Sequence, residues 1–332
     1  MIEATRSAGL ARLTAFVPLA GRAYRETRNE DRGPSDRSNV SMLAAYVRAR
    51  LVTEDEVLRA VLARHSAAAA EKFVQEVLWR TYWKGWLETR PIVWRHYLRD
   101  LDSASAAVAR DPDLARRLLE ATEGRTGNAA FDAWSRELVA TNYLHNHARM
   151  WFASIWIFTL QLPWELGADF FMQHLLCGDP ASNTLSWRWV AGLQTKGKTY
   201  LATRENIRRY TNGRLDPGPH LAREAAAIEG PSYGPGSVPA LDLEPQGDRT
   251  LLVVHDDDAA IETLAIHGLG VVASIGLLAA NGRSPHAVAP AVAAFARGAV
   301  ADALARAPRG DAETIVELGS LGSVDEIGRA HV

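Results

Sequence analysis

The amino-acid sequence predicts a mainly α-helical protein that is followed by a small α/β unit. All ten tryptophans fall between Trp79 and Trp189, in segments whose apolar residues have helical spacing. Residues 216–249 are rich in Pro and Gly, which is typical of a linker. Shorter apolar runs of strand length come after it. We therefore expect a helical domain over residues 1–215, a linker over residues 216–249 and an α/β domain over residues 250–325.

The helical part is expected to begin with an amphipathic helix that ends near Gly21. A polar loop over residues 24–38 follows, and then a helix over residues 42–50. The next helix carries a capping box at its start, because Thr53 is followed three residues later by Glu56. Two helices are thus predicted between this loop and the first tryptophan.

Longer helices are expected from residue 71 onwards. One face of the helix over residues 71–86 carries four residues at helical spacing: Glu76, Trp79, Arg80 and Trp83. Glu and Arg among tryptophans indicate a binding face, and an amphipathic helix with an ion pair at its rim is the alternative. Further helices are predicted over residues 94–123, with a break at Asp111-Pro112, over residues 131–140 and over residues 145–160.

The α/β domain is expected to hold strands over residues 250–255, 271–274 and 314–318 and a helix over residues 288–307. Three consecutive aspartates, Asp256 to Asp258, follow the first strand. We interpret them as an acidic turn, although three carboxylates are also a candidate metal site. No metal is expected elsewhere, because His145 and His147 are two residues apart and point to different sides of a helix.

Charge is divided unevenly along the chain. Residues 1–215 hold 30 Lys and Arg against 23 Asp and Glu, whereas the remainder holds 7 against 16. The positive part favours binding of a polyanion, and solvated arginine-rich helix faces are the alternative. The single cysteine, Cys177, excludes an internal disulfide and fits a reducing compartment. Without a signal peptide or a comfortable membrane span, we expect a cytoplasmic protein with no membrane contact.

The most aromatic stretch carries motifs that resemble the FAD-binding domain of the DNA photolyase/cryptochrome family. The family shows H-N-x-x-R-M, then a tryptophan, then D-G-D-x-x-x-N-x-x-x-W-x-W. Here residues 145–150 read HNHARM, Trp164 follows, and residues 177–189 read CGDPASNTLSWRW. The resemblance covers roughly residues 24–215. It departs from the family at Cys177, which replaces the first aspartate.

The resemblance implies FAD as the cofactor. The residues it implies for FAD binding are Tyr24, Val40, Ser41, Met42, Leu43, Ala44, Arg149, Cys177, Gly178, Asp179 and Asn183. The segment from Val40 to Ala44, together with Tyr24, corresponds to the family's pyrophosphate site, with alanines where the family has Ser-Pro. Taken alone, Ser41 also fits an ordinary helix cap. Asn183 would lie near the flavin N5.

The resemblance further implies DNA containing pyrimidine dimers as the partner. A pocket for a flipped-out dimer would be lined by Glu76, Trp79, Arg80, Trp83, Asn146 and His147. The residues implied to act in the reaction are Trp187, Trp164, Asn183 and Glu76. Trp187 would lie next to the flavin and Trp164 would be the next electron donor. The family's outer tryptophan is missing, since no tryptophan lies between Trp94 and Trp134.

The function predicted from this set is FAD-dependent, light-driven DNA repair, in which pyrimidine dimers are split by a photolyase-like lyase. The alternatives are a cryptochrome-type blue-light photoreceptor, whose acidic carboxy-terminal unit would contact a protein partner, and a flavin-binding protein without repair activity. An amino-terminal antenna domain is not expected. Residues 326–332 resemble a translated sequencing adapter, so we expect them to be non-native.

Overall fold

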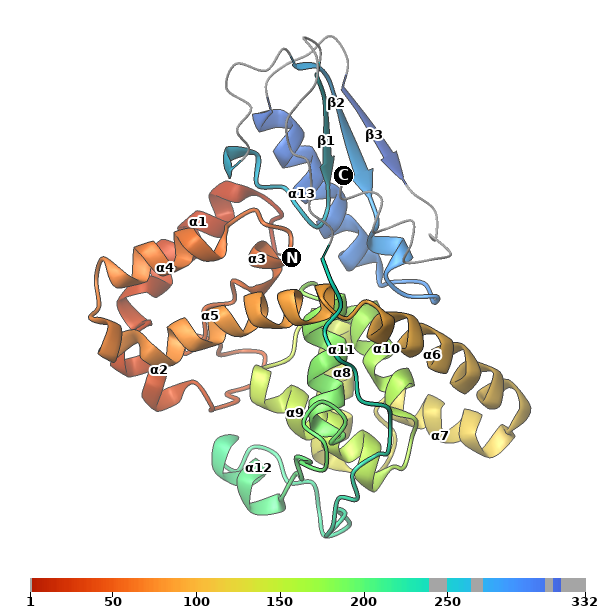
Figure 1. The fold of residues 1–332 in the computed structure, drawn as a ribbon. Helices are drawn as coiled ribbons and strands as arrows, with labels where there is room; N and C mark the ends of the chain where they lie inside the picture. Colours follow the sequence, from red (N-terminus) through yellow and green to blue (C-terminus); the bar gives the residue numbers. More distant parts are fainter. Residues whose placement is uncertain (1, 239–249, 264–270, 308–312, 318–332) are drawn as a thin grey trace. The chain divides into compact units, whose positions relative to one another are not determined.

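The structure is a computed structural model that describes residues 2–238, 250–263, 271–307 and 313–317. The suspected adapter at residues 326–332 lies outside the described residues. So do residues 239–249 of the predicted linker and residues 318–325 of the predicted α/β domain. The described part is mainly helical and its strands are confined to the carboxy-terminal region, which confirms the predicted fold class (Figure 1).

The chain divides into two compact units that interleave in sequence. Unit 1 comprises residues 1–22, 41–78 and 237–332, and unit 2 comprises residues 23–40 and 79–236. This division differs from the predicted domain boundary at residue 215. The amino-terminal helices belong to the same compact unit as the α/β part, and helix α5 crosses from one unit into the other.

Unit 1 begins with short helices. They are α1 (Arg6–Phe16), η1 (Val17–Leu19), α3 (Ala44–Arg48), α4 (Glu54–Leu62) and the first part of α5 (Ala67–Glu88). The predicted capping box is present at the start of α4, where Thr53 and Glu56 exchange side-chain and backbone hydrogen bonds. The predicted loop over residues 24–38 is wrong at its start, because α2 (Arg22–Thr27) occupies it. The helical hydrogen-bond pattern continues to the end of α2, where the Arg28 N–H donates to the Tyr24 carbonyl (2.8 Å).

The α/β part of unit 1 is a parallel three-stranded sheet. Its elements are β1 (Thr250–His255), η3 (Ile261–Thr263), β2 (Val271–Leu278), η4 (Ala280–Gly282), α13 (Pro290–Arg306) and β3 (Glu313–Glu317). The strand order is β1-β2-β3, and α13 connects β2 to β3 alongside the sheet (Figure 1). Along β1, Leu252 and Val254 are buried, whereas Leu251 and Val253 are exposed. This alternation is the pattern of a strand with one covered face.

Unit 2 is built from helices around an aromatic core. Its helices are α2 from residue 23 onwards, the rest of α5, α6 (Ile92–Arg110), α7 (Pro112–Thr122), α8 (Ala129–Thr141), α9 (Asn146–Ser154), the π-helix η2 (Ile155–Thr159), α10 (Trp164–His174), α11 (Pro180–Val190) and α12 (Arg204–Tyr210). Asp111 caps α7, which confirms the predicted break. Trp134 stacks on Trp151 with ring centroids 5.4 Å apart, and Phe131 stacks on Phe152 at 4.3 Å.

The described part of the predicted linker is docked on unit 2 rather than free. Three backbone N–H groups of this stretch donate to unit 2: Ala222 to Thr159 Oγ1 (3.1 Å), Ile228 to the Ala191 carbonyl (3.0 Å) and Gly236 to the Thr89 carbonyl (2.7 Å). The Tyr233 hydroxyl also pairs with His96 Nδ1 (2.8 Å). Residues 216–236 thus form no helix or strand, but some of their backbone N–H groups are paired with the rest of unit 2.

Candidate functional site

Polar side chains gather on the first turn of α11. Asp179 Oδ1 accepts the backbone N–H of Ser182 (2.8 Å) and caps the helix, and Pro180 holds its first position. One turn on, the buried Asn183 donates from Nδ2 to the Ala168 carbonyl (2.8 Å). The Ser182 hydroxyl is buried without a hydrogen-bond partner. This turn therefore combines a buried carboxylate, an amide and an unsatisfied hydroxyl.

The arginine of the HNHARM motif faces the position at which this chain departs from the family pattern. Arg149 donates from Nε to the Leu144 carbonyl (3.0 Å) and from Nη2 to Cys177 Sγ (3.2 Å). Its guanidinium also lies over the Tyr143 ring, 5.7 Å from the centroid. Cys177 thus takes the place of a carboxylate partner but supplies only a weak acceptor.

An ion pair joins the two predicted parts of the site. Arg80 Nη1 of α5 lies 3.3 Å from Asp179 Oδ2, and both side chains are largely buried. Next to it on α5, Trp79 is 49% exposed and stacks on Trp83, with ring centroids 5.5 Å apart. Tyr82 meets Trp79 edge-on at 5.4 Å. A predicted DNA-facing arginine and a predicted cofactor-facing aspartate are therefore direct neighbours, beside exposed aromatic rings.

The predicted electron donors lie on α10 and α11. Trp187 is buried, and its ring meets that of Trp156 edge-on at 6.1 Å. Gly167 of α10 lies against Trp187, and a Cβ built there would be 2.4 Å from the ring. Trp164, one helical turn before Gly167, has Tyr97 as its ring neighbour at 5.5 Å. The two tryptophans are thus linked through one turn of α10, and an electron step between them stays a prediction.

The histidines of the motif are held inside unit 2. His145 caps α9 by accepting the N–H of His147, and burial lowers the pKa of His145 to about 4. His147 stacks on Trp151 at 4.1 Å, and its Nε2 pairs with the Tyr200 hydroxyl (3.3 Å). Asn146, between them, is exposed. Of the three, Asn146 has the accessibility that contact with DNA requires.

Residues 41–44 of the predicted phosphate segment belong to unit 1. The backbone N–H of Leu43 donates to Ser41 Oγ (3.3 Å), and Arg12 Nε donates to the Ser41 carbonyl (2.8 Å). Met42 has a φ of 56°, which is uncommon for a residue with a side chain. Ala44, the first residue of α3, is exposed. The phosphate role of this segment stays a prediction.

The remaining predicted residues are divided between the units. Tyr24 and Val40 are half-buried in unit 2, and Gly178 is buried in its 175–178 turn, where its N–H donates to the Leu175 carbonyl (3.0 Å). Glu76 is half-buried on α5, in the part of that helix that belongs to unit 1. The roles predicted for these four residues stay predictions.

Unit 2 also contains a buried charge cluster that the sequence did not reveal. Arg37 Nη2 donates to Glu137 Oε1 (2.7 Å), and Asp31 accepts from Trp134 Nε1 (2.9 Å) and Arg214 Nη2 (2.8 Å). Burial, and next the neighbouring charge of Asp31, raise the pKa of Glu137 to about 7. Arg37 and Glu137 are a hundred residues apart, and no local pattern connects them.

This cluster predicts a pH dependence of stability. The folded protein holds the Glu137 proton up to about pH 7, whereas the unfolded chain releases it near its usual pKa of about 4.5. The contribution of Glu137 to the free energy of unfolding therefore falls as pH rises from 5 to 8. We expect Glu137→Gln to remove this fall, by on the order of 1–2 kcal/mol relative to wild type.

Urea unfolding of both proteins at pH 5 and pH 8 measures this difference. His145, whose lowered pKa acts with the opposite sign below its usual value of 6.5, is common to both proteins and cancels in the comparison. Parallel pH profiles would show that Glu137 is ionised in the folded protein throughout this range.

Comparison with known proteins finds a family model that matches the central region. Residues 73–215 match the model of the FAD-binding domain of DNA photolyase. A deoxyribodipyrimidine photo-lyase of Thermus thermophilus is 34% identical over 262 residues, which are 76% of this chain and 57% of that protein. One of Agrobacterium fabrum is 31% identical over 55% of this chain and 37% of that protein. The chain thus spans about half the length, or less, of these curated relatives.

A comparison with solved structures also finds a photolyase and a cryptochrome. A bacterial class III photolyase from Agrobacterium tumefaciens superimposes with a TM-score of 0.51 and 25% identity, covering 63% of this chain and 43% of that one. A cryptochrome of Synechocystis, at 0.50 and 23% identity, covers 62% of this chain and 43% of that one, and it shows the fold alone. None of the helices in the described part is long and apolar enough to cross a membrane.

The described residues fit the cofactor of that domain, which is FAD. In unit 2, the unsatisfied Ser182 hydroxyl and the unsatisfied Trp187 Nε1 are buried polar atoms for which a bound polar ring offers partners. Asp179 and Ser182 lie at the amino-terminal end of α11, where Arg149 contacts Cys177, and Trp187 lies further along the helix. Among the residues that the structure describes, no group of three or more His, Cys, Asp or Glu side chains is placed to hold a metal ion.

The contact of Arg149 with Cys177 predicts the effect of restoring the family's aspartate. In Cys177→Asp, the new carboxylate would accept a charge-assisted hydrogen bond from Arg149, worth about 1.5–3 kcal/mol. The added negative charge disfavours electron uptake by a flavin beside it. We expect the two-electron reduction potential of bound flavin to fall, and each 30 mV of the fall corresponds to about 1.4 kcal/mol.

Redox titration of wild type and variant tests this expectation, with Cys177→Ser as a control that changes the side chain without adding charge. Asp179 is already paired with Arg80, so it is not expected to compensate. Equal potentials in wild type and Cys177→Asp would show that residue 177 does not influence the flavin.

Proposed function

We propose that this chain, whose residues 73–215 match the FAD-binding domain of DNA photolyases, is a flavin enzyme that repairs pyrimidine dimers in DNA with light. The observation that carries the proposal is the Arg80–Asp179 ion pair. It connects the residues expected at the flavin with those expected at the lesion.

The residues of the site are assigned distinct tasks. Bound, reduced FAD supplies the light absorption and the electron that splits the dimer. Arg149, Asp179 and Asn183 would orient the flavin ring. The pyrophosphate would be held by Tyr24 and by the segment over residues 40–44. Trp79 stacks on the flipped-out dimer, with Arg80 beside it. The positive charge of residues 1–215 attracts the DNA backbone.

The exposed ring of Trp79 predicts a loss of DNA binding when it is removed. Trp79→Ala should weaken binding of a dimer-containing oligonucleotide by about 1–3 kcal/mol and leave flavin content unchanged. The neighbouring Leu78, 46% exposed on the same helix, provides the control variant Leu78→Ala. Fluorescence anisotropy measures both, and equal affinities would remove Trp79 from the DNA surface.

Salt dependence gives a separate check of the same surface. Binding by wild type and by Trp79→Ala should weaken in parallel as salt rises, because the phosphate contacts release counterions in both. Stacking of a base on Trp79 releases no counterions, so its loss should not change the salt dependence. Binding of wild type that does not respond to salt would contradict a phosphate-dominated interface.

The decisive experiment for the function is light-dependent repair by chemically reduced protein. An oligonucleotide with one pyrimidine dimer is mixed with the protein, and illuminated and dark samples are compared. Repair in the light alone supports the proposal. Flavin that responds to light without repair would support the photoreceptor alternative, with a protein partner for the acidic part. The cytoplasmic location stays a prediction.

A further inference from the structure

Three consecutive aspartates after β1 hold the helix that follows the proposed phosphate segment. Arg48 of α3 donates from Nη1 to the Asp256 carbonyl (2.8 Å) and lies 3.3 Å from Asp256 Oδ2. Its Nη2 is 2.5 Å from Asp257 Oδ1. Arg50 Nε lies 2.9 Å from Asp258 Oδ1. Arg48 is 4% exposed and Asp256 is 0% exposed, so this pair is fully removed from water.

The contact between α3 and the α/β part extends beyond charge. The backbone N–H of Ala259 donates to the Ala49 carbonyl (2.9 Å). Tyr46 meets Phe295 of α13 edge-on, with ring centroids 6.0 Å apart, and both rings are buried. Residues 46, 48, 49 and 50 therefore all bind partners that lie more than two hundred positions later in the chain.

Asp256 also ties this contact to the sheet. Its Oδ1 accepts the backbone N–H of Ala279 (2.7 Å), directly after β2. The same carboxylate thus fixes the ends of two strands with one oxygen and the Arg48 guanidinium with the other. A displacement of the β1–η3 turn would be transmitted directly to α3.

The phosphate segment needs such support. α3 has only five residues, and a helix of that length has little stability of its own. The positive φ of Met42 (56°) before it and of Arg50 (53°) after it are strained for residues with side chains. Strain of this kind persists only where surrounding contacts hold the backbone. Arg12 supplies one such contact at Ser41, and the aspartate turn supplies the others.

We propose that the Asp256–Asp258 turn positions α3, and with it residues 41–44, for binding of the FAD phosphates. This inference rests on the proposed function, because the phosphate role of residues 41–44 belongs to it. The α/β part is then a structural component of cofactor binding. The aspartates act through Arg48 and Arg50 and are positioning residues.

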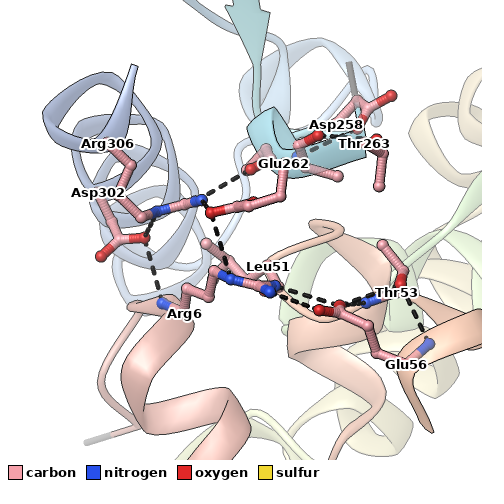
Figure 2. A network of polar contacts seen from close by, with 11 residues as sticks. Arg6, Leu51, Thr53, Glu56, Asp258, Glu262, Thr263, Asp302 and Arg306 are labelled. Carbon is pink, nitrogen blue, oxygen red and sulfur yellow. Dashed lines mark hydrogen bonds and ion pairs between the residues drawn. The ribbon is translucent and has the colours of Figure 1, made fainter. Parts of the chain in front are cut away.

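A second ion-pair network in unit 1 offers a matched control. Figure 2 shows its members joining α1, α4, η3 and α13: Arg6, Glu56, Glu262, Asp302 and Arg306. Asp302 accepts the backbone N–H of Arg6 (3.2 Å) and pairs with Arg306 Nε (2.9 Å), and its side chain is 17% exposed. It connects the amino-terminal helices to the α/β part as Asp256 does, but its contacts are with α1 and α13 rather than α3.

The test compares cofactor affinity in full-length protein from which flavin has been removed. Asp256→Asn and Arg48→Met are each expected to weaken FAD binding about tenfold or more, because one buried partner is lost. The double variant should be no weaker than the worse single variant, since both remove the same contact. Riboflavin has the same ring but no phosphate, and its affinity should not change.

Asp302→Asn separates positioning from general destabilisation. It should lower the thermal midpoint of the flavin-free protein without changing the FAD dissociation constant. If Asp256→Asn and Asp302→Asn weaken FAD binding equally, or if neither weakens it, the aspartate turn has no special role and the inference is overturned. Arg48→Lys, which keeps the charge, should recover part of the lost affinity.

Failure of this inference is distinguishable from failure of the proposed function. Wild-type protein that binds FAD tightly and repairs dimers, together with an Asp256→Asn variant of equal affinity, removes only the positioning role. Wild-type protein that does not bind FAD removes the function itself.

Discussion

Trp187→Phe is expected to abolish photoreduction of bound, oxidised flavin and to leave repair by chemically reduced protein largely intact. Phenylalanine is far harder to oxidise than tryptophan, so the expected first electron donor is lost. The fold should tolerate the change, because phenylalanine keeps an aromatic ring at this buried position and no protein group accepts a hydrogen bond from Trp187 Nε1. Absorption spectra during illumination, with and without an external thiol reductant, measure photoreduction.

Another buried tryptophan provides the control for Trp187. Trp151 is fully buried, and its Nε1 donates to Asn206 Oδ1 (2.9 Å). Trp151→Phe should therefore cost stability and keep photoreduction. Equal loss of photoreduction and of repair in Trp187→Phe would mean that this ring shapes the site rather than donating electrons.

Gly167→Val is expected to destabilise the protein by about 3 kcal/mol and to displace Trp187. A Cβ at this position would lie 2.4 Å from the Trp187 ring and 2.8 Å from that of Trp156. Neither ring can retreat easily, since both are buried. Replacing a glycine inside a helix normally raises stability. At Gly167 the steric clash with the two rings lowers it instead.

The glycine of α5 is the matched control. Gly85 also lies inside a helix, and a Cβ built there meets nothing within 4 Å. Gly85→Val should therefore leave stability unchanged or raise it slightly. Chemical unfolding of the two variants, together with the rate of flavin photoreduction, tests the contrast. A stable Gly167→Val protein with normal photoreduction would show that Trp187 can move without consequence.

The sequence predicted the parts of the fold that are specified locally. The capping box at Thr53 and Glu56 and the break at Asp111 were both found where the side chains place them. Hydrophobic spacing located the long helices, and apolar runs located the strands. The motif residues Arg149, Asp179 and Asn183 lie at the α9 and α11 ends that the pattern indicated. Local hydrogen bonding and burial determine all of these features.

The parts that escaped prediction depend on contacts between distant residues. The sequence predicted an acidic turn at Asp256–Asp258, with a metal site as the alternative. It did not predict the contact with Arg48, because Arg48 lies 208 positions away from Asp256. Arg37 and Glu137 were missed for the same reason. Residues 216–236 have the composition of a linker, and only the tertiary structure supplies partners for their backbone N–H groups. Composition alone does not predict such tertiary hydrogen bonds.

Repair and photoreduction both require FAD in the protein, and the proposed role of α3 is to bind its phosphates. The flavin released on denaturation of purified protein, identified by chromatography, tests this requirement most directly. We predict yellow protein that releases stoichiometric FAD. Protein that carries FMN, or that is colourless and cannot be reconstituted with FAD, would contradict it.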